Sequence, residues 1–152
     1  MIGFGVWVVT TPTDSGEGAG WRVLRIDFSP VLWHRSLMEQ TIYKILPRTL
    51  WVEAKAAGRL DGAPVDLSDG FIHFSTSTQV RETAVRHFAG IDDLVLLAVD
   101  PAVLGDGLKY EKSRGGALFP HLYGSLPVDA ILWVEDLPIG PAGHHLFPGT
   151  MP

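Results

Sequence analysis

The feature that most constrains the fold is a short apolar segment that runs directly into the start of a helix, in residues 69–80 (Asp-Gly-Phe-Ile-His-Phe-Ser-Thr-Ser-Thr-Gln-Val). Residues 71–74 follow an Asp-Gly turn and are aromatic or β-branched except for one histidine, which predicts a strand. Thr76 and Gln79 have the spacing of a capping box, which predicts that a helix begins beside them. The segment therefore places His73 at the junction of a strand and a helix.

This junction is a candidate binding site. Unpaired N–H groups at a helix amino terminus attract anions, so a phosphate or a ribose could be held where the polar side chains converge. The residues concerned are His73, Ser75 and Thr76. The alternative is that the hydroxyl groups only cap the helix and that His73 is a half-buried histidine without a ligand.

Composition restricts the class of protein. With 152 residues, of which 46% are hydrophobic, the chain is long enough for one core and one domain. It has 12 Lys and Arg against 17 Asp and Glu, so a nucleic-acid partner is not expected. The absence of cysteine excludes disulfides, thiolate catalysis and cysteine-based metal sites. No apolar run approaches the ~20 residues that span a bilayer and no basic signal-peptide flank is present, so the sequence predicts no membrane association and a cytoplasmic location.

The first part of the chain differs from the rest. Residues 1–37 contain glycine-spaced polar residues and no sustained period, which predicts an extension that need not be ordered. Three tryptophans within it, Trp7, Trp21 and Trp33, argue for some packing, because tryptophan is uncommon in disordered segments. Residues 38–152 are predicted to form a single domain.

Five strands and two main helices are predicted within that domain, with an irregular loop over residues 59–69 and a tail over 138–152 that trails along the surface. The strands are expected at 41–46, 71–74, 94–99, 108–112 and 129–135, and the helices after Pro47 and after Gln79. The continuously apolar run 94–99 predicts a strand buried on both faces. This order predicts a small α+β domain with a split, mostly antiparallel sheet.

Two further groups of residues are candidates for binding. Lys109, Glu111, Lys112 and Arg114 lead into Gly115-Gly116, a flexible turn that lets the backbone approach a phosphate; the alternative is a solvated hairpin. The segment 119–124 contains His121 and Tyr123 in a turn too apolar for open solvent, and the alternative is a loop that covers the core.

If segment 119–124 folds over the junction, His73 and His121 face one cleft, with Tyr123 or Tyr110 as an aromatic wall. A metal site built from His73, His121 and Glu111 is permitted by residue type. No ligand spacing supports it, so no metal is expected.

Several separate motifs resemble one family. They are Ile42-Tyr43-Lys44-Ile45, Asp69 to Thr76, Gln79-Val80 and Glu111 to Gly124, and together they are similar to the domain of unknown function 952 family over residues 38 to about 147. The resemblance implies a small α+β domain near the ADP-ribosyltransferase-like fold, with a more distant similarity to RNA 2′-phosphotransferases. That fold binds NAD in the cleft of a split sheet. The histidine expected in the first strand is replaced around Tyr43-Lys44.

The resemblance and the residues together give a functional hypothesis: the domain binds NAD, or a related nucleotide or phosphorylated ligand, in a cleft, with ADP-ribosyl transfer as the reaction. The candidate catalytic residues are His73, His121 and Glu111. The candidate ligand-binding residues are Tyr43, Lys44, Ser75, Thr76, Arg114, Gly115 and Tyr123, with Lys44 and Arg114 on phosphate and His73 on ribose. The alternative is a non-catalytic module that binds a small ligand or a partner protein through the same cleft.

Overall fold

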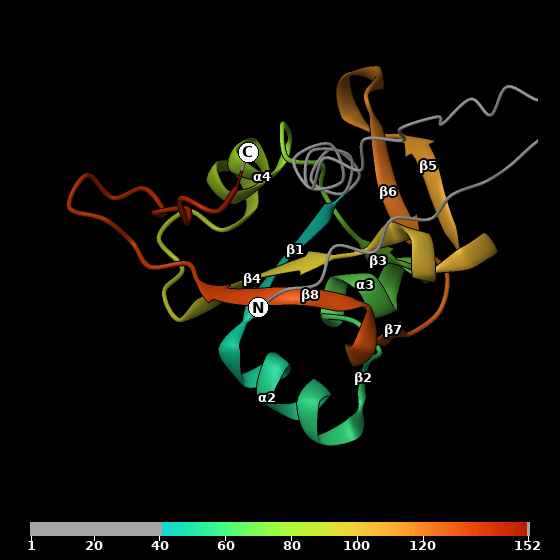
Figure 1. The fold of residues 1–152 in the computed structure, drawn as a ribbon. Coiled ribbons are helices and arrows are strands. Elements are labelled where there is room, and N and C mark those ends of the chain that lie inside the picture. The colour runs from blue at the N-terminus through green and yellow to red at the C-terminus, as the bar shows by residue number, and fades with distance from the viewer. Residues whose placement is uncertain (1–40, 152) are drawn as a thin grey trace, which may run out of the picture.

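The computed structural model describes residues 41–151, so the predicted extension over residues 1–37 lies outside the described part of the chain (Figure 1). The helices are α2 (Arg48–Ala57), α3 (Pro64–Asp69) and α4 (Val80–His87), and the strands are β1 (Ile42–Pro47), β2 (Arg59–Leu60), β3 (Ile72–His73), β4 (Leu94–Val99), β5 (Leu108–Lys112), β6 (Leu118–Leu122), β7 (Leu126–Pro127) and β8 (Ile131–Asp136). No helix in this part of the chain is both long and apolar enough to cross a membrane.

The strands form separate antiparallel sheets, with the orders β1-β4-β8, β2-β7 and β3-β6-β5. In Figure 1 the β3-β6-β5 sheet stands to one side of the β1-β4-β8 sheet, and α2 and α4 lie on different sides of the latter. The predicted α+β class and the split, antiparallel sheet are confirmed.

Strand β4 is the centre of the core, because all six of its residues are buried. Successive side chains of a strand point to opposite faces. Val95, Leu97 and Val99 accordingly pack in the cluster that contains Ala54 of α2. Leu94, Leu96 and Ala98 pack in a second cluster with Val80 and Ala84 of α4. The predicted burial of this strand on both faces is confirmed.

A short bridge joins the two three-stranded sheets. The N–H of Tyr43 in β1 donates to the carbonyl of Ser75 at 2.8 Å, and the N–H of Ser75 donates back to the carbonyl of Tyr43 at 2.9 Å. Beyond this bridge, Ile72 of β3 and Leu122 of β6 face the core cluster shared with α2. The neighbouring residues in each strand therefore point away from the core, which is what places His73 and His121 on the outer face of the β3-β6-β5 sheet.

The helix expected after the junction is present as α4. The side-chain oxygen of Gln79 accepts the N–H of Thr76 at 3.0 Å, which is one half of a capping box. The other half is absent, because the Thr76 hydroxyl pairs with that of Thr78 and the Ser75 hydroxyl pairs with that of Thr83. The junction is thus held by the glutamine amide and by hydroxyl pairs.

The prediction of an irregular loop over residues 59–69 is wrong, since this segment contains β2 and the helix α3. Pro64 occupies the start of α3, where its missing N–H costs nothing, and Asp66 accepts the N–H of Ala63 at 2.7 Å. Gly70 then ends the helix with a φ of 83°. Six residues are too few to show a helical period, so the hydrophobic pattern of this segment predicts a loop.

The prediction that residues 138–152 trail along the surface is also wrong in part. Phe147 and Met151 pack against the cluster that contains α4, and Met151 is only 8% exposed. The guanidinium of Arg81 lies 4.7 Å from the centre of the Phe147 ring. Apolar side chains in an irregular segment leave no periodic signal, yet burying them still removes apolar area from water.

Candidate functional site

The outer face of the β3-β6-β5 sheet gathers the residues that the sequence singled out for chemistry. Because the strands are antiparallel, His73 of β3 lies directly opposite His121 of β6, and His121 lies opposite Lys109 of β5. We call this surface the histidine face; its members are Phe71, His73, Lys109, Glu111, His121 and Tyr123. The centres of the two histidine rings are 5.3 Å apart and the rings meet edge to face at 72°. The two histidines therefore lie close together, but the predicted turn over residues 119–124 is wrong, because β6 (Leu118–Leu122) carries His121 and pairs with β3.

Phe71 packs against the other rings of the face. Its ring stacks on that of His121 at 4.3 Å between centres and lies 4.7 Å from that of His73 and 5.3 Å from that of Tyr123. This packing covers His121, whose side chain is 9% exposed, whereas the side chain of His73 is 36% exposed. The face therefore presents a fixed cluster of rings with an open edge at His73 and Tyr123.

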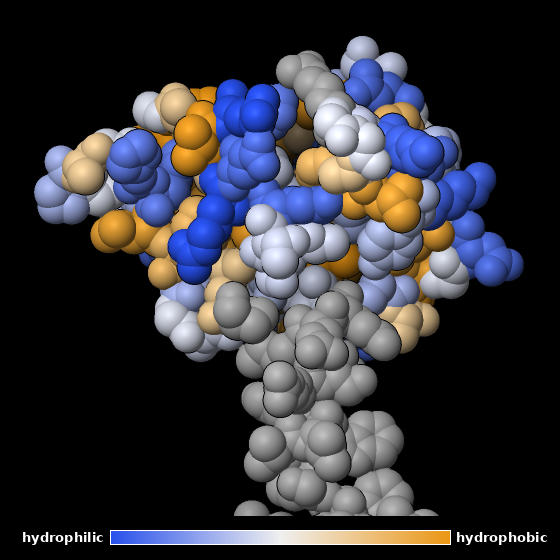
Figure 2. Space-filling model, turned by 90° about the horizontal axis from the view of Figure 1, so that it is seen from above, coloured by the Kyte–Doolittle hydropathy of each residue, from blue (hydrophilic) through white to orange (hydrophobic). Residues whose placement is uncertain are grey.

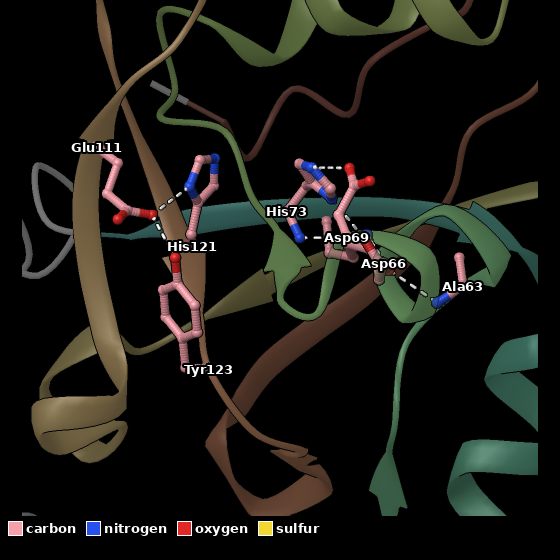
Figure 3. Close-up of polar contacts among 8 residues, drawn as sticks. Ala63, Asp66, Asp69, His73, Glu111, His121 and Tyr123 are labelled. Atoms are coloured by element: carbon pink, nitrogen blue, oxygen red, sulfur yellow. Dashed lines mark hydrogen bonds and ion pairs between the residues drawn. The ribbon is translucent and has the colours of Figure 1, made fainter.

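Asp66 of α3 fixes the orientation of His73 (Figure 3). One carboxylate oxygen accepts both the backbone N–H of His73 at 3.1 Å and a hydrogen bond with its ring Nδ1 at 2.8 Å. The Nζ of Lys44 donates to both carboxylate oxygens, at 2.8 and 2.7 Å. The second ring nitrogen of His73, Nε2, lies 3.2 Å from the carboxylate of Asp69. Both ring nitrogens of His73 are thus engaged by carboxylates.

Lys44 and Asp66 form a buried pair in which the carboxylate of Asp66 is held in its charged form. Burial alone would raise the pKa of Asp66, but the hydrogen bonds from His73 and the charge of Lys44 outweigh it and hold that pKa well below its usual range. Burial lowers the pKa of Lys44, and the adjacent Asp66 offsets part of this effect. Asp66 therefore carries a negative charge beside His73 throughout the neutral range.

Glu111 fixes the orientation of His121, as Asp66 does for His73 (Figure 3). A single carboxylate oxygen pairs with Nδ1 of His121 at 2.9 Å and accepts the hydroxyl of Tyr123 at 3.0 Å. These hydrogen bonds, from His121 first and Tyr123 second, hold the pKa of Glu111 below its usual value. The same contact raises the pKa of Tyr123, so its hydroxyl remains a donor. Each histidine of the face consequently has a carboxylate on its Nδ1.

Sequence reasoning missed Asp66, Asp69 and Phe71 as members of the site. Asp66 lies in the segment that is predicted to be an irregular loop. The one signal of a helix start there is Pro64, followed two residues later by the acidic Asp66. Phe71 is predicted only as part of a strand. Lys109 is predicted within a group that approaches a phosphate, separate from the histidines, and its Nζ lies 4.8 Å from the centre of the Tyr123 ring on the histidine face.

The remaining candidate residues are not among the residues that form the histidine face. Tyr43 and Lys44 are buried in β1, at 1% and 5% exposure, and Ser75 is buried at 4%. Gly115 lies in the turn between β5 and β6 with a φ of 76°, and the side chain of Arg114 is outside the described part of the structure. The ligand-binding roles assigned to these residues stay predictions, and in this structure the ammonium of Lys44 is occupied by Asp66.

An open cleft of about 410 Å³ lies elsewhere; its lining includes Ile42, Thr76 and Tyr110. Because side chains alternate along β5, Tyr110 points away from Lys109 and Glu111. Of the two tyrosines considered as an aromatic wall, only Tyr123 shares the face with the histidines. Figure 2 shows hydrophobic residues scattered among hydrophilic ones on the side of the molecule seen there, without one broad apolar patch among the described residues.

The chain matches one family model and the solved structures of one similar protein. The profile of the family described as "Protein of unknown function (DUF952)" matches residues 45–134. The crystal structure of protein CC0527 from Caulobacter crescentus is 51% identical, with a TM-score of 0.68, and covers 70% of this chain and 93% of its own. The solution structure of CC0527 is 51% identical over 69% of this chain and 90% of its own, with a TM-score of 0.63. No curated protein matches. The chain therefore belongs to the DUF952 family.

Proposed function

We propose that the histidine face binds NAD or a related nucleotide. The observation that carries this proposal is the row formed by His73, His121 and Lys109 across three strands, beside a cluster of aromatic rings. A nucleotide combines a flat ring, a polyhydroxylated sugar and an anionic phosphate. The face offers a chemical partner for each of these parts.

The proposed contacts follow from the chemistry of each side chain. Tyr123 is 43% exposed and offers a ring on which a base or a nicotinamide stacks. Asp69, which is partly exposed, accepts hydrogen bonds from ribose hydroxyls. Lys109 is the described cation of the face and takes a phosphate. The reaction that this arrangement would serve is transfer of the ADP-ribosyl group.

The competing function is a non-catalytic module that binds a small ligand or a partner protein through the same face. It is favoured by the position of the residues on the outer side of a sheet, where Lys109, Tyr123 and the side chain of Glu111 are open to solvent. Incubation with NAD separates the two functions. A transferase releases nicotinamide with water or cell extract as the acceptor, and a binding module returns NAD intact.

The binding proposal is tested by titrating NAD, ADP-ribose and AMP into the protein in a calorimeter. We expect Lys109→Ala to weaken the affinity for NAD about tenfold or more, because a hydrogen bond to a charged group contributes about 1.5–3 kcal/mol. Lys112→Ala is the matched control, since it removes the same charge from the same strand but from its other face. The control should change the affinity less than about twofold. Absence of heat from all three nucleotides would sink the proposal.

A further inference from the structure

The two histidines of the face differ in what their ring nitrogens contact. Nδ1 of His73 pairs with Asp66 at 2.8 Å and its Nε2 lies 3.2 Å from Asp69. Nδ1 of His121 pairs with Glu111 at 2.9 Å, whereas its Nε2 has no hydrogen-bond partner within residues 41–151. Figure 3 shows this second nitrogen of His121 directed away from Glu111. Of the two histidines of the face, only His121 therefore has a ring nitrogen without a hydrogen-bond partner among the described residues.

We infer that His121 is the proton-accepting group of the histidine face, and that Glu111 is the residue that positions it. The inference deepens the proposed function and rests on it for the identity of the substrate. A neutral imidazole carries its proton on one nitrogen and a lone pair on the other. A carboxylate on Nδ1 places the proton there, which leaves the lone pair on Nε2 for the ligand.

The surroundings of Glu111 support this assignment. Its carboxylate accepts a second hydrogen bond from Tyr123 on the same oxygen, which restrains the carboxylate in the geometry that His121 needs. Both contacts favour the ionised carboxylate, so Glu111 remains an acceptor at neutral pH. Phe71 stacked at 4.3 Å limits rotation of the His121 ring. Both ring nitrogens of His73 face carboxylates, so we assign His73 to orienting the ligand and not to accepting a proton.

The proton transfer is balanced when the acceptor is water or another hydroxyl compound. Nε2 of His121 takes the proton as the O–H bond breaks, and the freed oxygen forms the bond to the ribose C1′. The C1′–N bond breaks at the same carbon, and its electron pair leaves with neutral nicotinamide. The imidazolium formed on His121 is stabilised by the negative charge of Glu111, and it later returns the proton to solvent.

The first test needs no ligand. Long-range ¹H–¹⁵N correlation spectra of the full chain report which ring nitrogen of each neutral histidine carries the proton. We expect the proton of neutral His121 on Nδ1 in the wild type and a shift of population toward Nε2–H in Glu111→Ala. Glu82→Ala, which removes an exposed glutamate from α4, is the control and should leave the His121 signals unchanged. A proton on Nε2 in the wild type, or no change in Glu111→Ala, overturns the inference.

The second test uses nicotinamide release from NAD. We expect His121→Ala to lower kcat by about 10²–10⁴-fold, the usual contribution of a general base, and Glu111→Ala to lower kcat with little change in KM. His73→Ala should raise KM about as much as His121→Ala does, with little change in kcat. A large loss of kcat in His73→Ala and a small one in His121→Ala would overturn the assignment. If the wild type binds no nucleotide, the proposed function fails, and the ligand-free spectra still decide whether Glu111 sets the His121 tautomer.

Discussion

Replacing Asp66 with asparagine is expected to destabilise the protein by about 3–5 kcal/mol, the usual cost of removing one partner of a buried ion pair. Asp66 is 2% exposed and accepts hydrogen bonds from Lys44, Ala63 and His73. Asparagine leaves the buried ammonium of Lys44 without a counter-charge and offers a single acceptor oxygen to these donors. Thermal and urea unfolding of the two proteins measure the loss, which corresponds to roughly 10 °C or more in Tm for a chain of this size.

The pH dependence of the same variant gives a second readout. The folded pKa of Asp66 is depressed below the unfolded value of about 3.9, so its stabilisation is present above that pH and is lost as the pH falls through the folded pKa. Asp66→Asn should therefore show a shallower loss of stability in acid than the wild type. Burial lowers the pKa of Lys44, and without Asp66 nothing described offsets this, so the variant should regain stability as the pH rises toward about 10.

Asp69→Asn is the matched control for this prediction. Asp69 lies at the end of the same helix, but its side chain is 45% exposed. Removing an exposed charge costs about 1 kcal/mol or less. Equal effects of the two substitutions, or an unchanged acid profile in Asp66→Asn, would show that the buried pair does not stabilise the fold in this way.

Removing the two histidines together is expected to be strongly non-additive for nucleotide binding. His73→Ala and His121→Ala should each weaken NAD binding about tenfold, since a charge-assisted or ring contact of about 1.4 kcal/mol is lost in each case. The two residues are opposite each other in neighbouring strands and their ring centres lie 5.3 Å apart, so each substitution also disturbs the other residue. The double variant should depart from the sum of the singles by about 0.5–3 kcal/mol.

Calorimetry with NAD on the wild type, both single variants and the double variant completes this cycle. His87 provides the control, because it lies exposed in the last turn of α4 and makes none of the contacts described for the face. His121→Ala combined with His87→Ala should add within about 0.5 kcal/mol. Strict additivity for His73 with His121 would contradict a shared binding site. Unfolding curves of each variant show whether it is folded, so that a loss of affinity can be distinguished from unfolding.

Much of the fold followed from local patterns. The continuous apolar run of β4 predicted its burial on both faces, and the strand-to-helix junction at residues 71–80 predicted β3 and α4. These inferences succeeded because strand alternation, turn residues and capping spacing act between neighbours in the sequence.

The tertiary structure alone decided what each histidine touches. The pairing of Lys44, Asp66 and His73 joins β1, α3 and β3, and it exists because burial of the ammonium requires a carboxylate that packing brings near. Strands of two residues such as β3 have no period of their own, so their register comes from pairing with β6. That register sets His121 between His73 and Lys109, because in antiparallel strands opposite residues share a face.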